Sequence, residues 1–294
     1  MQRLRGPAAG MLLPCLKDVA RGDKRYRIFG ICDNQTMDEV RRCWEGNAPV
    51  WTRLSRAGFD VCRDGQNTPA FFGMLPDVRG LDGIDIGCVE GHNTRLLAAH
   101  GARVTAVDFA FEFVRAAAAE QRDGIRYAVA DALRLPFADG SFDFATAFMS
   151  LMDVAGAERV LPESARVLRP GGFLQFSILH PCLSPLQRRV VRDSSGAPVA
   201  VEVARYFERA DGELERWIFS AAPAEAKEGL PPFQVPRFHR TLAEWLNAIA
   251  DAGLRVERCV EPRADDETAA RYPTLADTRI APNFILFRCR LDPR

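Results

Sequence analysis

GIDIGCVEGHN, residues 83–93, joins an apolar stretch typical of a buried strand to the start of a helix through a turn with two glycines. Gly87 and Gly91 lack a β-carbon, which lets the backbone turn sharply and lets a ligand approach the free N–H groups at the helix N-terminus. The same pattern also occurs as an ordinary connection between a strand and a helix. The segment therefore predicts a strand–turn–helix unit and offers a candidate cofactor loop.

An acidic residue in the next strand strengthens the cofactor interpretation. Asp108 ends that strand 21 positions after Gly87, where a Rossmann-type unit places a carboxylate that accepts hydrogen bonds from both ribose hydroxyls. An aspartate at a strand end also serves as a helix cap. The occurrence of Asp108 together with the glycine turn favours the ribose-binding interpretation.

Strand and helix patterns alternate outward from this unit, from Ile84 to about Phe287. Strands separated by helices of this length imply right-handed crossovers and a parallel sheet. Two last strand candidates, 254–260 and 283–290, have a loop between them and no convincing helix, so we expect them to form an antiparallel hairpin. The sequence thus predicts a Rossmann-like α/β fold with a seven-stranded, mostly parallel sheet in which 283–290 is the one antiparallel strand. The other expected strands are 84–87, 104–108, 126–130, 142–149 and 173–179, and the expected helices between them are 93–99, 111–121 and 158–167.

The flanking segments have patterns of their own. Thr36 and Glu39 form a capping-box pattern that predicts a helix start, and Pro49 is expected to split the following stretch into two short helices. Turn-forming sequences at 194–198 and 210–213 predict a β meander, and its position after the fifth strand indicates a lid over the ligand crevice. A later helix is expected over 241–253, with Thr241 as its N-cap. The expected organisation is a disordered or loosely held arm at 1–35, a helical N-terminal extension at 36–80, the Rossmann-like core at 81–182, a β-rich lid insertion at 183–237, and a C-terminal helix with a closing hairpin at 238–294.

Composition narrows the class of protein. Lys and Arg together number 39, as do Asp and Glu, so the chain has no net charge to attract nucleic acid or an acidic membrane. Eight scattered cysteines lack the two-residue spacing of metal and redox motifs. No run is long enough to cross a bilayer. We expect reduced thiols, a cytoplasmic location, no metal site, and neither a nucleic-acid nor a membrane partner.

Three ordered stretches carry a family resemblance, and they cover about residues 83–182. The chain resembles class I S-adenosylmethionine-dependent methyltransferases of the small-molecule, type 11 kind. The stretches are IDIGCVEGHNTRLLAAHGARVTAVDFA (84–110), ADALRLPFADGSFDFATAFMSLMDV (130–154) and ARVLRPGGFLQFSILHPC (165–182).

The resemblance implies S-adenosylmethionine as cofactor and a role for each matching residue. Asp85 would orient the amino-acid portion, Asp108 would bind the ribose with Phe109 beside the adenine, and Asp131 would reach the adenine amino group. Met149 and Ser150 would border the transferred methyl. The implied cofactor-binding residues are Asp85, Gly87, Cys88, Gly91, His92, Asn93, Asp108, Phe109, Asp131, Ala132, Met149 and Ser150.

One position departs from the family pattern. Val89 stands where the family usually has glycine, and a β-branched residue tolerates positive φ poorly. Either the loop has ordinary dihedral angles there or cofactor binding is weakened.

The sequence offers two candidates for a general base, which methyl transfer needs only if the acceptor atom carries a proton. His180 follows the fifth strand, where it either faces the acceptor pocket as the base or caps the strand. Asp153, after the fourth strand, is the second candidate. Trp44 and Trp51 are typical of core positions, although Trp51 could border the pocket.

These features predict a methyltransferase that acts on an O or N atom of a small-molecule acceptor. One alternative is a protein that binds S-adenosylmethionine without transferring its methyl group. Another alternative is an RNA or protein methyltransferase. The neutral charge counts against it. So does the sequence MSLMD at 149–153, which follows the fourth strand in place of an Asn-Pro-Pro-Tyr-like tetrad. An NAD site is disfavoured because Asp85 would repel a diphosphate.

Overall fold

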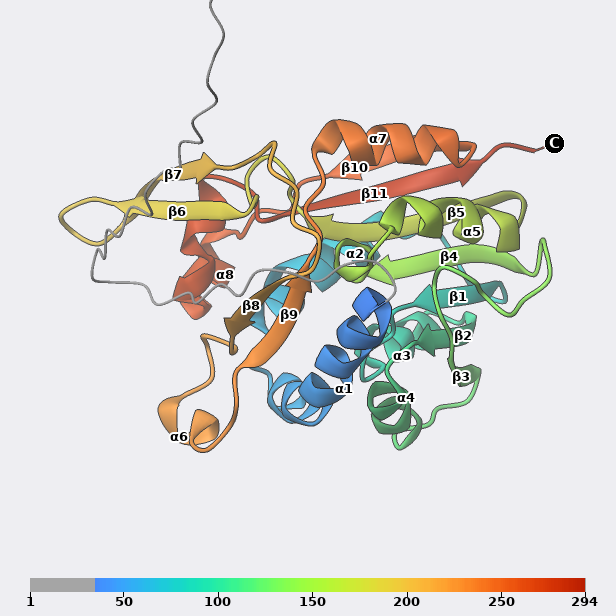
Figure 1. Cartoon of the computed structure of the whole chain (residues 1–294), viewed down its shortest axis with the longest axis horizontal. Helices are drawn as coiled ribbons and strands as arrows, with labels where there is room; N and C mark the ends of the chain where they lie inside the picture. The colour runs from blue at the N-terminus through green and yellow to red at the C-terminus, as the bar shows by residue number, and fades with distance from the viewer. Residues whose placement is uncertain (1–34, 294) are drawn as a thin grey trace, which may run out of the picture.

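A seven-stranded sheet organises the protein, whose computed structural model we describe over residues 35–293 (Figure 1). The strand order is β10–β11–β5–β4–β1–β2–β3. Neighbours from β3 to β5 pair in parallel, and β11 runs antiparallel to both β5 and β10. The predicted fold class, with its single antiparallel strand, is confirmed. The strands are β1 Asp82–Ile86, β2 Arg103–Asp108, β3 Ile125–Val129, β4 Phe142–Phe148, β5 Leu168–Leu179, β10 Leu254–Val260 and β11 Phe284–Leu291.

Helices cover both faces of the sheet because its strands are apolar on both sides. In β4, Ala145 and Ala147 face the core beneath α5 (Ala157–Val167) and α7 (Leu242–Asp251). The alternate residues Phe144 and Phe148 face the opposite core, beneath α2 (Thr68–Met74) and α3 (His92–Ala99). Helix α4 (Phe111–Ala118) connects β2 to β3. The C-terminal helix begins as predicted, since Thr241 and Glu244 form a capping box.

The N-terminal extension differs from expectation in its first helix. Helix α1 is continuous over Gln35–Arg56 and contains Pro49, so the predicted division into two helices is wrong. Thr36 lies inside the helix and not at its N-cap. Packing overrides the proline here, because α1 lies along α4 and β9 and buries Val40, Trp44 and Leu54. A π-helical turn, η1 (Arg63–Asn67), then leads directly into α2.

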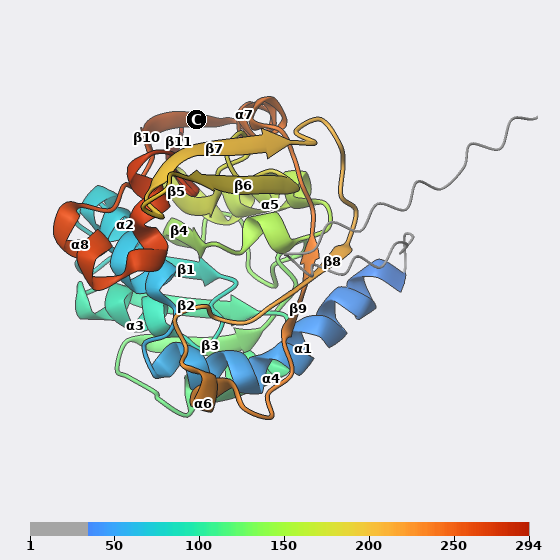
Figure 2. The same ribbon diagram turned by 90° about the vertical axis from the view of Figure 1, so that its left-hand side faces the viewer.

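The insertion forms two separate hairpins, so the predicted single meander is wrong. Strand β6 (Gln187–Arg192) pairs with β7 (Pro198–Ala204) around the expected turn, and β8 (Glu213–Trp217) pairs with β9 (Phe233–Arg237). The sequence at 210–213 leads into β8, while Tyr206 and Phe207 lie in a turn. A short helix, α6 (Ala224–Lys227), joins β8 to β9. The two views show β9 beside α1, while β6 and β7 lie away from α1 (Figures 1 and 2).

The connection between β10 and β11 is also more ordered than predicted. It contains α8 (Asp266–Arg271) and a 3₁₀ segment, η3 (Pro273–Arg279). Asp265 caps α8 by accepting a hydrogen bond from the Thr268 N–H at 2.7 Å. The helix is too short to give a periodic pattern in the sequence.

The expectations for the arm at 1–35 lie outside the described residues, apart from Gln35, which begins α1. Within residues 35–293 the six cysteines are free thiols. In that same range no helix has the length and apolar character needed to span a membrane.

Candidate active site

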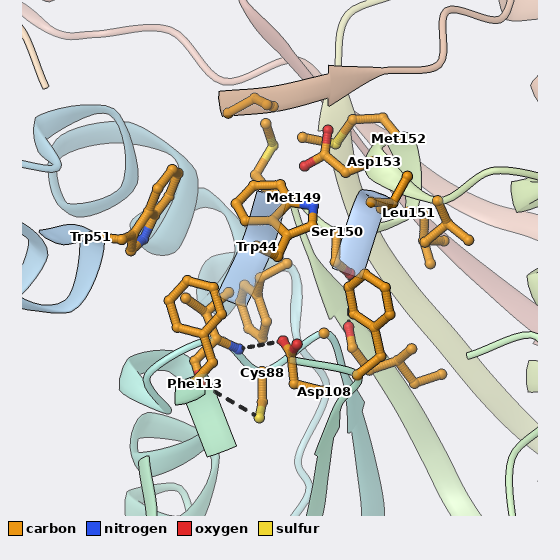
Figure 3. A pocket seen from close by; sticks show the side chains of 18 of the residues that line it. Trp44, Trp51, Cys88, Asp108, Phe113, Met149, Ser150, Leu151, Met152 and Asp153 are labelled. Atoms are coloured by element: carbon orange, nitrogen blue, oxygen red, sulfur yellow. Dashed lines mark hydrogen bonds between the residues drawn. The ribbon is translucent and has the colours of Figure 1, made fainter. Parts of the chain in front are cut away.

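A cavity of about 550 Å³ opens at the carboxyl ends of β1, β2 and β4 (Figure 3). Helix α1 and the β8–β9 hairpin complete its walls. Most of the predicted site residues meet there although they come from distant parts of the chain. Those lining the cavity are Asp85, Gly87, Cys88, His92, Asn93, Asp108, Phe109, Asp131, Ala132, Met149, Ser150 and Asp153.

The glycine turn shapes the floor of this cavity. Gly87 has φ +75°, and a β-carbon there would lie 2.4 Å from Cβ of Ser150, whose hydroxyl donates to the Ile86 carbonyl at 2.7 Å. Gly91 has φ +81° and directly precedes α3. A β-carbon added at Gly91 would lie 2.7 Å from the Tyr127 hydroxyl. Gly91 itself does not line the cavity. Its prediction as a contact residue is therefore corrected to a packing role, because the turn directs it toward β3 and α4.

Two of the three non-glycine residues with positive φ among residues 35–293 lie at the cavity, the third being Arg205. Val89 has φ +50° and Met149 has φ +52°, and both line the cavity. Such conformations cost a non-glycine residue about 1–2 kcal/mol. The loop therefore keeps the backbone shape that glycine would allow, and the alternative of ordinary dihedral angles at Val89 is excluded.

Asp85 is held at the end of β1 by two hydroxyl groups. Thr94 donates to one carboxylate oxygen at 2.5 Å and Thr146 donates to the other at 3.0 Å. Burial raises the pKa of Asp85 to about 6, although these hydrogen bonds oppose the shift. The carboxylate is thus fixed in direction below the glycine turn.

Asp108 links the end of β2 to the glycine turn. One carboxylate oxygen accepts the Val89 N–H at 3.0 Å and the other accepts the Ala110 N–H at 2.9 Å. Burial raises its pKa to about 6. Each oxygen keeps capacity for a further hydrogen bond, so the carboxylate is placed to accept two neighbouring hydroxyls. Farther along the wall, Asp131 accepts the Leu133 N–H at 2.9 Å.

The other end of the glycine turn meets the π-helical segment. Asn93 accepts a hydrogen bond from the Thr68 hydroxyl at 3.0 Å, and His92 lies 3.9 Å from Asp64. The pKa of His92 is lowered, and burial is the largest cause. These contacts hold both residues at the cavity wall.

Sequence reasoning missed Asn67, which also lines the cavity. It is 2% exposed, and its Oδ1 accepts a hydrogen bond from Ser177 at 3.1 Å. Its Nδ2 has no hydrogen-bond partner among residues 35–293. π-Helical turns frequently mark functional sites, so the feature that identifies Asn67 is the turn in the structure and not a pattern in the sequence. No sequence pattern distinguished this asparagine from an ordinary loop residue.

Asp153 lies across the cavity, at the end of the 3₁₀ turn η2 (Leu151–Asp153) (Figure 3). Burial raises its pKa to about 8, whereas the charge of Arg237 lowers it. Arg237 is itself paired with Glu215 across β8 and β9, at 2.9 Å. The result is a carboxyl group that exchanges its proton near neutral pH.

His180 does not line the cavity, so the prediction that it faces an acceptor pocket is wrong. Its side chain is directed away, with Nε2 2.7 Å from Oε1 of Glu261 and Nδ1 accepting the Cys182 N–H at 3.2 Å. The preceding residue, Leu179, lines the cavity instead. Side chains alternate in direction along a strand, and His180 at the end of β5 continues that alternation.

Comparison with known proteins agrees with this geometry. Residues 84–176 match the family model described as a methyltransferase domain. This match covers the glycine turn, Asp108, Asp131 and η2. Residues 84–176 form a methyltransferase domain.

A stretch that covers about a third of the chain is also similar to curated methyltransferases. It is similar to a demethylmenaquinone methyltransferase of Thermobifida fusca, at 37% identity over 36% of this chain and 47% of that protein. It is similar to the 27-O-demethylrifamycin SV methyltransferase of Amycolatopsis mediterranei, at 37% identity over 36% of this chain and 42% of that protein. The matches therefore span less than half the length of these relatives.

Solved structures extend the likeness beyond the methyltransferase domain. An S-adenosylmethionine-dependent methyltransferase from Mesorhizobium loti superposes with a TM-score of 0.62 at 29% identity, covering 76% of this chain and 96% of that one. A cyclase with 17% identity and a TM-score of 0.57, over 88% of this chain and 97% of that one, shares the fold alone. S-adenosylmethionine is the cofactor that the methyltransferase domain implies. The residues of the cavity fit it, since Asp108 and Asp131 present acceptors to hydroxyl and amino groups and Gly87 lines the cavity where the glycine turn leaves β1.

Proposed function

We propose that this chain transfers a methyl group from S-adenosylmethionine to an O or N atom of a small-molecule acceptor. The observation that carries the proposal is that one cavity contains both the cofactor-type acids and a separate carboxyl group, Asp153, across from them. A protein that only stores the cofactor has no need of the second group.

Each side chain has a distinct part in this mechanism. S-adenosylmethionine supplies an activated methyl group when bound. Asp108 would accept hydrogen bonds from the ribose hydroxyls, and Asp131 would accept one from the adenine amino group. Asp85 orients the amino-acid end through the turn it supports. Asp153 takes the proton from the acceptor, and the surrounding walls exclude water so that the reacting atoms stay aligned.

We propose that the β8–β9 part of the insertion acts as the lid. Glu213, Glu215, Trp217 and Arg237 line the cavity, as does Phe219 just beyond β8. No residue of β6 or β7 does so among the residues described. The lid function predicted for 183–237 is therefore assigned to its second hairpin.

Two alternatives remain distinct from this proposal. A protein that binds the cofactor without transfer is supported by the strained Val89. An RNA or protein methyltransferase is disfavoured by the zero net charge and by the partly covered, largely apolar cavity. We further propose a cytoplasmic location without a nucleic-acid partner.

The cofactor assignment is tested with Asp108→Ala. Loss of two hydrogen bonds to a buried charged acceptor is expected to cost about 2–4 kcal/mol of binding free energy. Calorimetry with S-adenosylhomocysteine should show affinity lower by about 30-fold or more. Asp123→Ala, at an exposed position before β3, is the matched control and should bind normally. Equal affinity of Asp108→Ala and the control would refute the assignment.

A further inference from the structure

Four aromatic rings gather on the side of the cavity that α1 and the β8–β9 hairpin form. Trp44 and Trp51 come from α1, Trp217 from β8, and Phe219 from the residues just after it, and all four line the cavity. Trp51 stands 5.5 Å from Trp217 and 5.0 Å from Phe219 between ring centroids, in edge-to-face contacts. We refer to these four residues as the aromatic wall. Planar rings that meet edge to face leave ring faces available to a flat molecule.

The side chain of Asn47 holds the aromatic wall in place, because it forms with β9 the pair of hydrogen bonds that a neighbouring strand would form. Asn47 on α1 donates from Nδ2 to the Gln234 carbonyl at 2.8 Å, and its Oδ1 accepts the Gln234 N–H at 2.9 Å. Asn47 is 5% exposed, and both hydrogen bonds are part-buried. The pair fixes β9, and through it β8, against the helix that carries Trp44 and Trp51. A preformed wall selects ligands by shape.

Three of the charged side chains that line the cavity, Glu215, Arg237 and Asp153, carry little uncompensated charge beside the aromatic wall. Glu215 and Trp217 lie two residues apart on β8 and so share a face. The charge of Glu215 is balanced by Arg237 at 2.9 Å. Because the pKa of Asp153 is raised to about 8 by burial, its carboxyl group is neutral at pH 7. Neither an anionic nor a cationic acceptor finds a free opposite charge in this group of three residues.

We propose that the acceptor is a flat, largely apolar, uncharged molecule with a weakly acidic hydroxyl group, bound against the aromatic wall with that hydroxyl directed at Asp153. This inference rests on the proposed methyl transfer and names its substrate class. The acceptor oxygen forms the new bond to the methyl carbon, and the carbon–sulfur bond breaks with its electron pair going to sulfur. The hydroxyl proton goes to the Asp153 carboxylate, so the step proceeds in the ionised fraction of the protein, which grows as pH approaches 8.

The test uses three probes with the protein first saturated with S-adenosylhomocysteine. 2-Naphthol is flat and carries an acidic hydroxyl, 2-decalol has the same carbon skeleton without planarity, and 2-naphthoate is flat but anionic. Calorimetry and quenching of tryptophan fluorescence report binding without any need for turnover. We expect 2-naphthol to bind at least about 10-fold more tightly than either of the others, which corresponds to about 1.4 kcal/mol.

Two variants locate the site. Trp217→Leu, at a position 36% exposed and therefore tolerant of change, should weaken 2-naphthol binding about 5- to 10-fold. Phe207→Leu, in the same insertion, 87% exposed and outside the cavity lining, is the matched control and should leave binding unchanged.

The outcomes separate this inference from the proposed function. Failure of S-adenosylhomocysteine to bind would overturn the methyltransferase proposal itself. If it binds normally, the acceptor inference alone is overturned by absent 2-naphthol binding, by 2-decalol or 2-naphthoate binding equally well, or by an unchanged Trp217→Leu variant.

Discussion

Asp153 makes the stability of the protein depend on pH in a recognisable direction. Its pKa is about 8 in the folded state, against an ordinary value of 3.8 that describes the unfolded chain. Between these values the unfolded chain releases the proton and the folded chain keeps it, so the contribution of Asp153 to stability falls as pH rises from about 4 to 8. Asp153→Asn lacks this dependence. Its Tm relative to the parent protein should therefore increase by a few degrees between pH 5 and pH 9.

The same variant also reports on chemistry. If Asp153 accepts the proton, Asp153→Asn should reduce turnover by about 100-fold or more. The parent rate should rise as pH approaches 8, and the variant should lack that rise. A Tm difference that stays constant from pH 5 to pH 9 would contradict the raised pKa, and an unchanged rate would contradict the role as base.

Gly87 gives a second test, of the cofactor turn. Gly87→Ala places a methyl group 2.4 Å from Cβ of Ser150 at φ +75°, where something must shift. We expect a lower Tm and loss of S-adenosylhomocysteine binding in calorimetry. Gly46→Ala is the control, since Gly46 lies within α1 with nothing near its missing β-carbon. That change should raise stability by about 0.5–1 kcal/mol, and similar behaviour of the two variants would be inconsistent with the strained turn.

The sequence was informative about individual residues where roles follow from local order. Asp85, Asp108 and Asp131 could be placed because each closely follows or ends a parallel strand, and such ends meet at one edge of the sheet. The directions of Gly91 and His180 could not be predicted, because they depend on how a turn and a strand end are oriented by packing. Asn67 gave no pattern at all, since its position follows from a π-helical turn.

The contact between α1 and β9 depends on Asn47 and can be tested on its own. Asn47→Ala removes the side-chain partner of the Gln234 N–H and carbonyl, and the loss of these two part-buried hydrogen bonds is expected to cost about 1–3 kcal/mol of stability. Hydrogen exchange should then accelerate in β8 and β9 while the seven-stranded sheet keeps its protection. Arg42→Ala, which changes an exposed side chain of the same helix, should leave the exchange of the hairpin unaltered. Uniform acceleration across all strands would show that Asn47 does not act locally.

Elements were predictable where a repeating pattern was long enough. The five parallel strands and α3, α4, α5 and α7 follow from alternating apolar segments, and Thr241 and Glu244 identify a helix start directly. Pro49 misled because a proline penalty is local, whereas the packing of α1 on α4 and β9 acts along the whole helix. The pairing of β8 with β9, rather than with β7, depends on tertiary contacts with α1.

Across the whole molecule, His180 joins the end of β5 to the segment after β10 through Glu261, at 2.7 Å. His180→Ala should lower the free energy of unfolding by about 1–3 kcal/mol, because Glu261 and the Cys182 N–H lose a partner. Cofactor affinity and turnover should stay within about threefold, since the side chain lies outside the cavity lining. Melting temperature and calorimetry on the same preparation provide the check. A stable variant with greatly reduced turnover would return His180 to the position of catalytic base.

The position of β11 between β5 and β10 has a consequence for how the protein is made. Strand β5, with 12 residues, is the longest strand of the sheet, and the partner on its outer side is the last strand in the sequence. Until residues 284–291 leave the ribosome, β5 therefore presents a long row of unpaired N–H and C=O groups flanked by apolar side chains. Such edges recruit strands from other molecules. A chain that stops before Phe284 is thus expected to accumulate as insoluble aggregates and not as a smaller working enzyme.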